Sequence, residues 1–294
     1  MSLRIGTRGS ALALVQTENV VGMLADRGIE AEVITITTAG DTATHVPLHA
    51  IGGQGVFVRA LDDAILRGEI DAAVHSMKDI PAARPAGLTC SAVLERDSPA
   101  DFLAYEGPLD AVRIVGSSST RRRAQVLRAD PTLEVKQLRG NVDTRIRKLR
   151  EGQYDAIMLA EAGLQRLGLQ LPGEALPTDR FVPSPNQGTV AVVCRDDPEI
   201  TGPLAALDHA PTRLDVAIER AVMEEVGGGC FTPQGIYCRD GDLIAEVLAL
   251  DGSRWERIER HVATPEEARE CGRALREKAG DLIREARAAL GLKS

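Results

Sequence analysis

Long apolar runs and aromatic side chains are both scarce in this 294-residue chain. No apolar run approaches the roughly 18 residues that a membrane-spanning helix needs, so we expect no membrane partner. The N-terminal segment enters a strand pattern at once, without the apolar region of a signal peptide, and a cytoplasmic location is expected. One Trp, three Tyr and four Phe offer few platforms for stacking bases, so nucleic acid is not an expected partner.

Paired cysteine motifs are also missing. The five cysteines include no CxxC pair, which argues against a disulfide framework and against a zinc site. His45 and His49 have ligand-like spacing, but they flank Pro47 in a polar stretch without a helical pattern. We therefore predict no metal site, and we expect Cys90 and Cys194, which lie in apolar strand-like runs, to be buried.

One segment carries a charge opposite to that of the whole chain. The net charge is −8, yet residues 113–150 hold nine Arg and two Lys against three acidic residues, which makes this segment about +8. A solvated charged face would normally mix the signs. A local field of this kind instead indicates an anionic ligand.

A strand, a polar glycine loop and a helix follow one another twice along the chain. The first copy spans 4–27 and the second spans 113–129. Residues 67–74 also match 151–158, and both read as a helix end, a turn and a buried strand. The first copy holds about 26 additional residues, which we place in a glycine-rich loop within 38–57.

The alternation of strands and helices predicts two α/β domains with parallel sheets. A buried strand at 190–194 is expected to return to the first sheet, so that the chain crosses twice between the domains, as in a hinge. We predict that domain 1 comprises 1–95 and 189–207, domain 2 comprises 96–188, and a small α+β domain 3 comprises 208–294.

The third domain is predicted to be a small antiparallel sheet with helices. Thr212 is expected to cap a helix that runs to Val226, and the Asp-Gly pair at 240–241 indicates a hairpin. Thr264 is followed by Pro and, three residues on, by Glu, a pattern that predicts the start of one long helix to about Leu290.

The same domain carries the sequence GGGC at 227–230. Three glycines leave one flank of Cys230 without side chains, so the thiol can accept a bulky covalent attachment. Cys230 follows a predicted helix C-terminus, whose dipole disfavours a thiolate, and this favours a permanent tether over a turnover nucleophile. A thiol-dependent acyl transferase stays an alternative, because the spatial neighbours of Cys230 are not known from the sequence.

Hydroxyl groups and arginines gather where the predicted strands end and helices begin. Backbone N–H groups, hydroxyls and the helix dipole bind carboxylate or phosphate at such places, and Arg suits two-point binding of a carboxylate. Helix capping beside surface arginines is the alternative for either loop alone. The residues that we expect to bind such an anion are Arg8, Ser10, Ser117, Ser119, Arg121, Arg122, Arg139, Arg145 and Arg166.

The sequence HSMKD at 75–79 follows a buried strand and ends at the edge where open α/β sheets place their ligands. Asp79 beside the cationic Lys78 is expected to stay ionised, so that it can stabilise a cationic intermediate or move protons. A surface ion pair of little energetic value is the alternative.

Together these motifs closely resemble the porphobilinogen deaminase (hydroxymethylbilane synthase) family, in order and through essentially the whole chain. The matching segments are 8–10, 75–79, 117–122, 138–145, 162–166, 187–188 and 228–230. The resemblance implies two periplasmic-binding-protein-like α/β domains of type II and a small third domain. Ala50 and Gln54 stand where family members often have lysines.

The resemblance also implies an activity, that of a transferase of tetrapyrrole (haem) biosynthesis. Such enzymes join four porphobilinogen molecules head to tail, with loss of four ammonia molecules, and release hydroxymethylbilane. They work on a dipyrromethane cofactor held by a thioether at the position of Cys230. Each pyrrole bears an acetate and a propionate, so arginines are needed in an acidic protein. We expect a cytoplasmic monomer whose small-molecule substrate is porphobilinogen.

Site residues follow from the same resemblance. Asp79 matches the catalytic carboxylate, which would offset positive charge as it develops, with Lys78 assisting. The cofactor-binding positions are Cys230, Lys78, Asp79, Ser117, Ser119, Arg121, Arg122, Arg139, Arg145 and Gly163. The substrate-binding positions are Arg8, Ser10, Arg139, Arg145, Arg166 and Gln187.

A two-domain binding protein for a carboxylate ligand, without catalysis, is the other reading of the repeat and its hinge. It accounts for the arginines, but it accounts for neither Cys230 nor the third domain.

Overall fold

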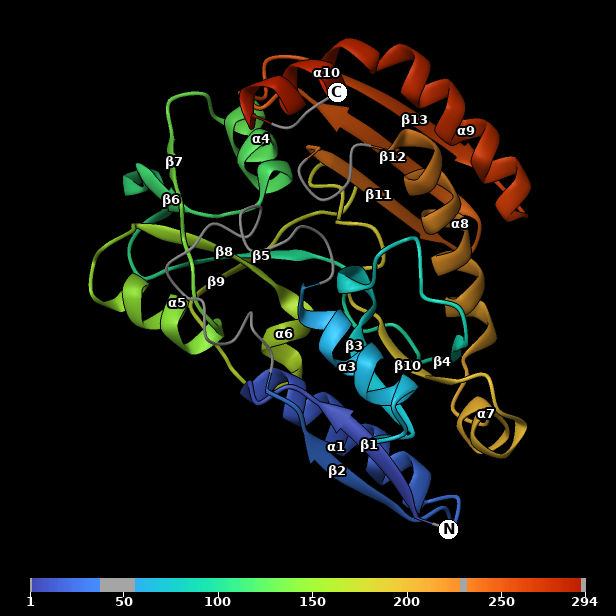
Figure 1. The fold of residues 1–294 in the computed structure, drawn as a ribbon. Helices are drawn as coiled ribbons and strands as arrows, with labels where there is room; N and C mark the ends of the chain where they lie inside the picture. Colours follow the sequence, from blue (N-terminus) through green and yellow to red (C-terminus); the bar gives the residue numbers. More distant parts are fainter. Residues whose placement is uncertain (1, 38–55, 228–231, 292–294) are drawn as a thin grey trace. The chain divides into compact units, whose positions relative to one another are not determined.

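The chain forms two compact units (Figure 1). The structure is a computed structural model that describes residues 2–37, 56–227 and 232–291. Unit 1 comprises Met1–Asp97 and Gly188–Arg213, and unit 2 comprises Ser98–Gln187 and Leu214–Ser294. Unit 2 contains a five-stranded and a three-stranded sheet; its division into domains 2 and 3 stays a prediction.

Unit 1 is built on a sheet with the strand order β2-β1-β3-β10-β4. Its strands are β1 (Leu3–Thr7), β2 (Ala31–Thr35), β3 (Ala72–Ser76), β4 (Leu88–Val93) and β10 (Val190–Arg195). Its helices are α1 (Ala11–Ala25), α3 (Val56–Leu66), the single turn η2 (Met77–Asp79) and α7 (Pro198–Ala205). Val20 and Leu24 of α1 share a core cluster with Leu3 and Ile5 of β1, so α1 covers one face of this sheet.

The five-stranded sheet of unit 2 has the corresponding order β7-β6-β8-β5-β9. Its strands are β5 (Asp101–Tyr105), β6 (Ile114–Gly116), β7 (Glu134–Lys136), β8 (Ala156–Ala160) and β9 (Gly173–Ala175). Its helices are the single turn η3 (Leu109–Ala111), α4 (Thr120–Ala129), α5 (Val142–Arg150) and α6 (Glu161–Arg166). Separate core clusters around Ile157 and around Met158, neighbours on β8, show that both faces of this sheet are covered.

The internal repeat predicted from the sequence is present in the backbone. Gly6 pairs with Ala73, two residues after Asp71, and Gly116 pairs with Ile157, two residues after Asp155. The backbone N–H of Asp71 donates to the carbonyl oxygen of Arg4 in β1, and the Asp71 carboxylate accepts the N–H of Arg4. Asp155 makes the same pair of hydrogen bonds with Ile114 in β6. The two sheets are therefore built in the same register.

Both glycines of this register lie close to the side chain that precedes the repeated aspartate. An added Cβ at Gly6 would lie 2.2 Å from Cδ1 of Ile70, and one at Gly116 would lie 2.9 Å from Cδ1 of Tyr154. Ile70 and Tyr154 each precede the repeated aspartate, so the same close approach recurs in both units.

The predicted α/β class is confirmed, with two five-stranded sheets and a small antiparallel C-terminal sheet. The prediction that the two large sheets are parallel holds for only part of each sheet, namely for β1, β2 and β3 in unit 1 and for β6, β7 and β8 in unit 2. In unit 1, β10 runs antiparallel to β3 and β4, and in unit 2, β5 runs antiparallel to β8 and β9. Each is the first strand after the chain enters its unit from the other one, so no crossover helix within the unit sets its direction.

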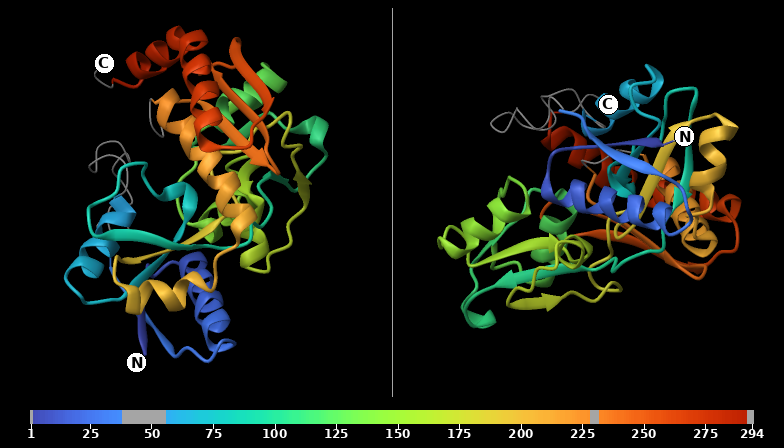
Figure 2. Two further views of the ribbon diagram at one scale, coloured as in Figure 1. Left: turned by 90° about the vertical axis from the view of Figure 1, so that its right-hand side faces the viewer. Right: turned by 90° about the horizontal axis from the view of Figure 1, so that it is seen from below.

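The C-terminal part of unit 2 has a three-stranded antiparallel sheet, β11-β12-β13. Its elements are α8 (Ala210–Val226), whose residues 210–213 belong to unit 1, β11 (Gln234–Arg239), β12 (Asp242–Leu248), β13 (Trp255–His261), α9 (Pro265–Lys278) and α10 (Gly280–Ala289). Figure 2 shows these helices against the sheet, and Ile218, Val222, Leu275 and Leu282 enter the core cluster that includes Ile236 and Val247 of the sheet. The predicted hairpin is confirmed, since Asp240 and Gly241 connect β11 to β12 with positive φ angles.

Two helix predictions in this part were wrong. Helix α8 begins at Ala210, so Thr212 lies inside its first turn, where its Oγ1 accepts the N–H of Arg96 at 3.2 Å. The long C-terminal helix is broken at Ala279, which separates α9 from α10. Thr264 does cap α9 as predicted, accepting the N–H of Glu267 at 3.2 Å.

Candidate functional site

In unit 1 the polar loops after β1 and β3 lie at one edge of the sheet. These strands are parallel neighbours, so their carboxyl ends meet there. Ser10 caps α1 by accepting the N–H of Ala13 at 3.4 Å, and Gln16 of α1 is hydrogen-bonded to Ser76 of β3 at 3.0 Å. The sequence motifs that contain Arg8 and Asp79 are thereby brought to the same edge.

Lys78 and Asp79 lie in η2, which follows β3 without a gap. The N–H of Met77 donates to the carbonyl oxygen of Thr189 at 2.9 Å, which holds this turn against the segment entering β10. Asp79 is exposed and Lys78 is half-buried. The turn therefore offers a solvent-accessible carboxylate at the end of a buried strand, as the sequence predicted.

His75 precedes this turn and is 6% exposed. Burial lowers the pKa of His75 to about 3, and the positive charges of Arg84 and Arg8 lower it further. Among the described residues, its Nε2 atom has no hydrogen-bond partner. The imidazole is therefore neutral at physiological pH, and the surroundings of β3 at this edge are positive.

In unit 2 the loop between β6 and α4 holds the predicted serines. Ser119 is the N-cap of α4, and its Oγ accepts the N–H of Arg122 at 3.4 Å. Ser117 is buried, and its Oγ accepts the N–H of Ser119 at 3.2 Å. Ser118 donates its hydroxyl to the carbonyl oxygen of Leu138, which ties this loop to the one before α5.

Arg121 and Arg122 converge on a carboxylate of the same unit, that of Asp101. Arg121 donates from Nη1 and Nη2 to the two oxygens of Asp101 at 2.6 and 3.2 Å. Arg122 donates from Nε and Nη2 to Oδ1 at 3.0 and 2.8 Å. All three side chains are at most 9% exposed, so this is a buried cluster with one more cation than anions.

Asp101 was missed by the sequence analysis. Its burial opposes ionisation, but the two arginines outweigh burial and hold the pKa of Asp101 well below its ordinary value. The sequence signal that could have revealed Asp101 is a single acidic residue at the start of the apolar strand β5. A carboxylate in such a strand becomes buried, and a buried carboxylate needs a cationic partner.

Arg145 lies in the first turns of α5, after the motif LRGN. Its Nε donates to the carbonyl oxygen of Gly140 at 2.8 Å, and within the described ranges it forms no ion pair. Burial lowers the pKa of Arg145 to about 10, and the positive charge of Arg122 contributes. Gly140 has φ 115°, and an added Cβ there would lie 2.6 Å from Cγ2 of Thr144, so only glycine fits.

The remaining residues of unit 2 that were predicted to bind the cofactor or substrate are spread over its loops and helix α6. Arg139 is half-buried, and its carbonyl oxygen accepts from Lys148 at 3.1 Å. Gly163 is buried within α6, and Arg166 ends that helix. Gln187 is 1% exposed, and its Nε2 donates to the carbonyl oxygen of Pro99 and to Asp101, both at 2.8 Å. The Gln187 amide thus contacts the same carboxylate as Arg121 and Arg122.

Several sequence predictions fall outside the described residues. These are Cys230, the replaced loop lysines at Ala50 and Gln54, and the histidines His45 and His49. In the described part of the chain, no group of His, Cys, Asp and Glu residues could hold a metal ion. No helix there combines the length and the apolar character needed to cross a membrane.

Two family models cover nearly all of the chain. Residues 3–202 match "Porphobilinogen deaminase, dipyromethane cofactor binding domain", and residues 213–281 match "Porphobilinogen deaminase, C-terminal domain". The chain belongs to the porphobilinogen deaminase family. Both ranges agree with the motifs found along the sequence.

Curated relatives agree with the porphobilinogen deaminase models. The chain is 52% identical to a "Probable porphobilinogen deaminase" of Methanosarcina acetivorans, covering 96% of this chain and 93% of the relative. It is 43% identical to the protein of the same description from Archaeoglobus fulgidus, covering 95% and 99%. It is 44% identical to a "Porphobilinogen deaminase" of Trichlorobacter lovleyi, covering 85% and 82%.

Solved structures similar to this member of the porphobilinogen deaminase family include binding proteins. The methionine-binding protein MetQ is 13% identical with a TM-score of 0.45, and the match covers 70% of this chain and 89% of MetQ. A periplasmic substrate-binding protein of an ABC transporter from Coxiella burnetii is 15% identical with a TM-score of 0.44, covering 74% and 96%.

Proposed function

We propose that this protein is an active porphobilinogen deaminase (hydroxymethylbilane synthase). It would condense four porphobilinogen molecules head to tail, with loss of four ammonia molecules, on a dipyrromethane cofactor held by Cys230. The observation that carries the proposal is a group of two buried arginines and the half-buried Arg145, with an excess of positive charge, in a chain whose cofactor-domain match spans residues 3–202.

The arginines of unit 2 have the charge needed to bind carboxylates. Arg121, Arg122 and Arg145 supply three guanidinium groups, and Asp101 is the carboxylate among them. Because burial disfavours the Arg145 cation, an incoming anion would be bound strongly there. Acetate and propionate groups on the cofactor and the substrate supply such anions.

A dipyrromethane fits this set of donors. Its carboxylates would be held by Arg145, with Ser117, Ser119 and Arg139 around them and Arg121 and Arg122 behind. When bound, the cofactor supplies the pyrrole carbon to which the first substrate ring is joined. Gly163, a buried residue of α6, is the remaining cofactor-binding position of this proposal.

The residues of unit 1 would perform the chemistry. Asp79 is exposed at the end of β3, so its carboxylate can accept pyrrole N–H groups and offset positive charge as ammonia leaves. Lys78, Arg8 and Ser10 would bind substrate carboxylates at the same edge of the sheet. The neutral His75 behind them adds no positive charge of its own.

The mass of the intact protein tests this proposal. Protein from a host that makes porphobilinogen should exceed the sequence mass by a dipyrrole-sized adduct and should consume porphobilinogen. Cys230→Ser should lack the adduct, whereas the control Cys271→Ser, at a buried packing position, should retain it. An unmodified wild-type mass from such a host would contradict the proposal. Carboxylate binding without an adduct or turnover would instead support a binding protein.

We further propose that the protein is a cytoplasmic monomer without a nucleic-acid partner. Its net charge of −8 opposes binding to the phosphate backbone. Size-exclusion chromatography with light scattering tests the monomer, since a mass of about twice 31.4 kDa would contradict it.

A further inference from the structure

A second buried carboxylate of unit 2 lies in the C-terminal sheet. Glu246 on β12 is fully buried. Its carboxylate accepts from Nη1 of Arg128 at 2.8 Å and from Nε2 of Gln125 at 2.9 Å, and Nη1 of Arg257 lies 3.5 Å away. Two of these donors belong to α4, the helix that begins at the predicted carboxylate-binding loop.

Gln125 connects Glu246 to Arg121. Its Nε2 donates to Glu246 and to the carbonyl oxygen of Val182, and its Oε1 accepts from Nη1 of Arg121 at 2.9 Å. A reversed amide would face its oxygen to the carboxylate and its NH₂ group to the guanidinium, so the charges at both ends allow one orientation. The chain of contacts therefore runs from Glu246 through Gln125 to Arg121 and Asp101 without a break.

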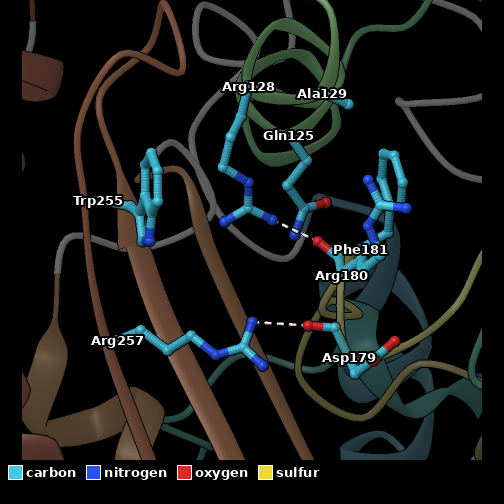
Figure 3. Close-up of a pocket in the computed structure, with 8 residues that line it drawn as sticks. All are labelled: Gln125, Arg128, Ala129, Asp179, Arg180, Phe181, Trp255 and Arg257. Carbon is cyan, nitrogen blue, oxygen red and sulfur yellow. Dashed lines mark hydrogen bonds between the residues drawn. The ribbon is translucent and has the colours of Figure 1, made fainter.

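The spacing along α4 explains how one helix makes these contacts. Arg121, Gln125 and Arg128 are separated by four and three residues, so they share one face of the helix. Figure 3 shows Gln125 and Arg128 extending from α4 into a pocket whose wall also includes Trp255 and Arg257 of β13, with the segment 179–181 on the side opposite Trp255. The Arg128 guanidinium lies 5.4 Å from the centre of the Trp255 ring.

A backbone contact attaches the same helix to the C-terminal sheet independently of these charges. Gly252 lies in the turn between β12 and β13 with φ 72°. An added Cβ there would lie 2.4 Å from the carbonyl oxygen of Ala124 and 2.5 Å from the nitrogen of Arg128. The turn packs directly on the backbone of α4, so the position of α4 depends on the C-terminal sheet.

We propose that Glu246 is a positioning residue for carboxylate binding, acting through Gln125 on Arg121. The C-terminal sheet thereby holds the start of α4 and the Arg121 side chain in the geometry that the cofactor and substrate carboxylates require. This inference rests on the proposed function. A buried ionic network commonly adds little net stability, and in this protein it would select one arrangement of the groups it joins.

Glu246→Gln tests the connection at its start, and Gln125→Met tests it at its middle residue. Each variant should raise the KM for porphobilinogen about fivefold, whereas a loss of stability alone would lower the active fraction and leave KM unchanged. The double variant should raise KM no more than the stronger single variant, because both interrupt one path. Glu259→Gln is the control, since Glu259 also accepts from Arg257, at 2.6 Å, and is exposed.

Hydrogen–deuterium exchange of the backbone provides a readout that does not depend on turnover. Peptides covering 119–123 should exchange faster in Glu246→Gln and in Gln125→Met than in wild type, and at the wild-type rate in Glu259→Gln. Unchanged exchange and unchanged KM in both variants would overturn the inference, as would additive effects in the double variant. If the wild-type protein showed no adduct and no turnover, the proposed function would be contradicted. Faster exchange of residues 119–123 in the two variants would still support the positioning of α4.

Discussion

The two five-stranded sheets share their strand order and register, but they place different groups at the ends of equivalent strands. Asp79 follows Asp71 by eight residues, and Gly163 follows Asp155 by the same number. Likewise, His75 of unit 1 corresponds to Leu159 of unit 2. Unit 1 has an exposed carboxylate and a neutral imidazole at these positions, whereas unit 2 has a buried glycine and a leucine.

The two units also differ in how their charged side chains are arranged. In unit 2, two buried arginines contact one carboxylate, and burial lowers the pKa of a third arginine, Arg145. Unit 1 leaves its carboxylate Asp79 in solvent. In the proposed function, one scaffold would therefore support a set of binding cations in one copy and a reactive group in the other, because loops can change while the buried register stays.

The largest effect is expected from Asp101→Asn, which removes the buried carboxylate that Arg121 and Arg122 share. Two buried guanidinium groups would then lack a charged partner, and we expect a loss of about 3–5 kcal/mol in the free energy of unfolding. Urea unfolding followed by fluorescence of Trp255, the single Trp of the chain, measures this in unit 2. The exposed Asp110→Asn is the control, and equal stability of the two variants would contradict the buried cluster.

Asp79→Asn tests the reactive group of unit 1. The variant should fold and carry the dipyrrole adduct, yet lose about 10²–10³ in kcat because an amide offsets no positive charge. Asp63→Asn, another exposed carboxylate of unit 1, should keep the wild-type rate. Near-normal turnover of Asp79→Asn would refute its assignment as the reactive group.

His75→Leu gives unit 1 the residue that unit 2 has at this position. The folded-state pKa of His75, about 3, lies below its ordinary 6.5, so the unfolded chain takes up a proton that the folded protein excludes. The stability contributed by neutral His75 is full above pH 6.5 and is lost as the pH falls toward 3, by about 2 kcal/mol at pH 5. Urea unfolding at pH 7.5 and at pH 5 should show a smaller decrease in His75→Leu than in wild type. The exposed His261→Gln should keep the wild-type decrease, and a wild-type decrease in His75→Leu would be inconsistent with a buried neutral imidazole.

Arg145→Gln tests whether the third arginine of unit 2 binds a carboxylate. Loss of one charge-assisted contact should lower kcat/KM by about tenfold. Arg147→Gln is a matched control on the same helix, since Arg147 is exposed and its nearest acidic partner is Glu151. If Arg145→Gln and Arg147→Gln lower kcat/KM equally, the effect comes from the loss of one positive charge anywhere on the helix and not from the loss of a contact with a bound carboxylate.

Part of the difference between the two units could be predicted from the local sequence. The HSMKD motif after an apolar strand predicted that Asp79 stands at a strand end, and the structure confirms that placement. The strand directions and the break at Ala279 could not be predicted, because both depend on packing between segments distant in sequence. Thr212 is a capping residue by type, and yet its hydroxyl contacts Arg96, 116 residues away.

By itself, the sequence determined most of the strand and helix order, which residues are candidates for binding a carboxylate, and the family resemblance. These depend on periodicity and on short motifs, which act within a few residues. Only the tertiary structure decided which carboxylates the arginines contact. Asp101 and Glu246 are separated from their partners on α4 by 20 to 121 residues, and a buried charge is stable only where the fold brings an opposite charge to it.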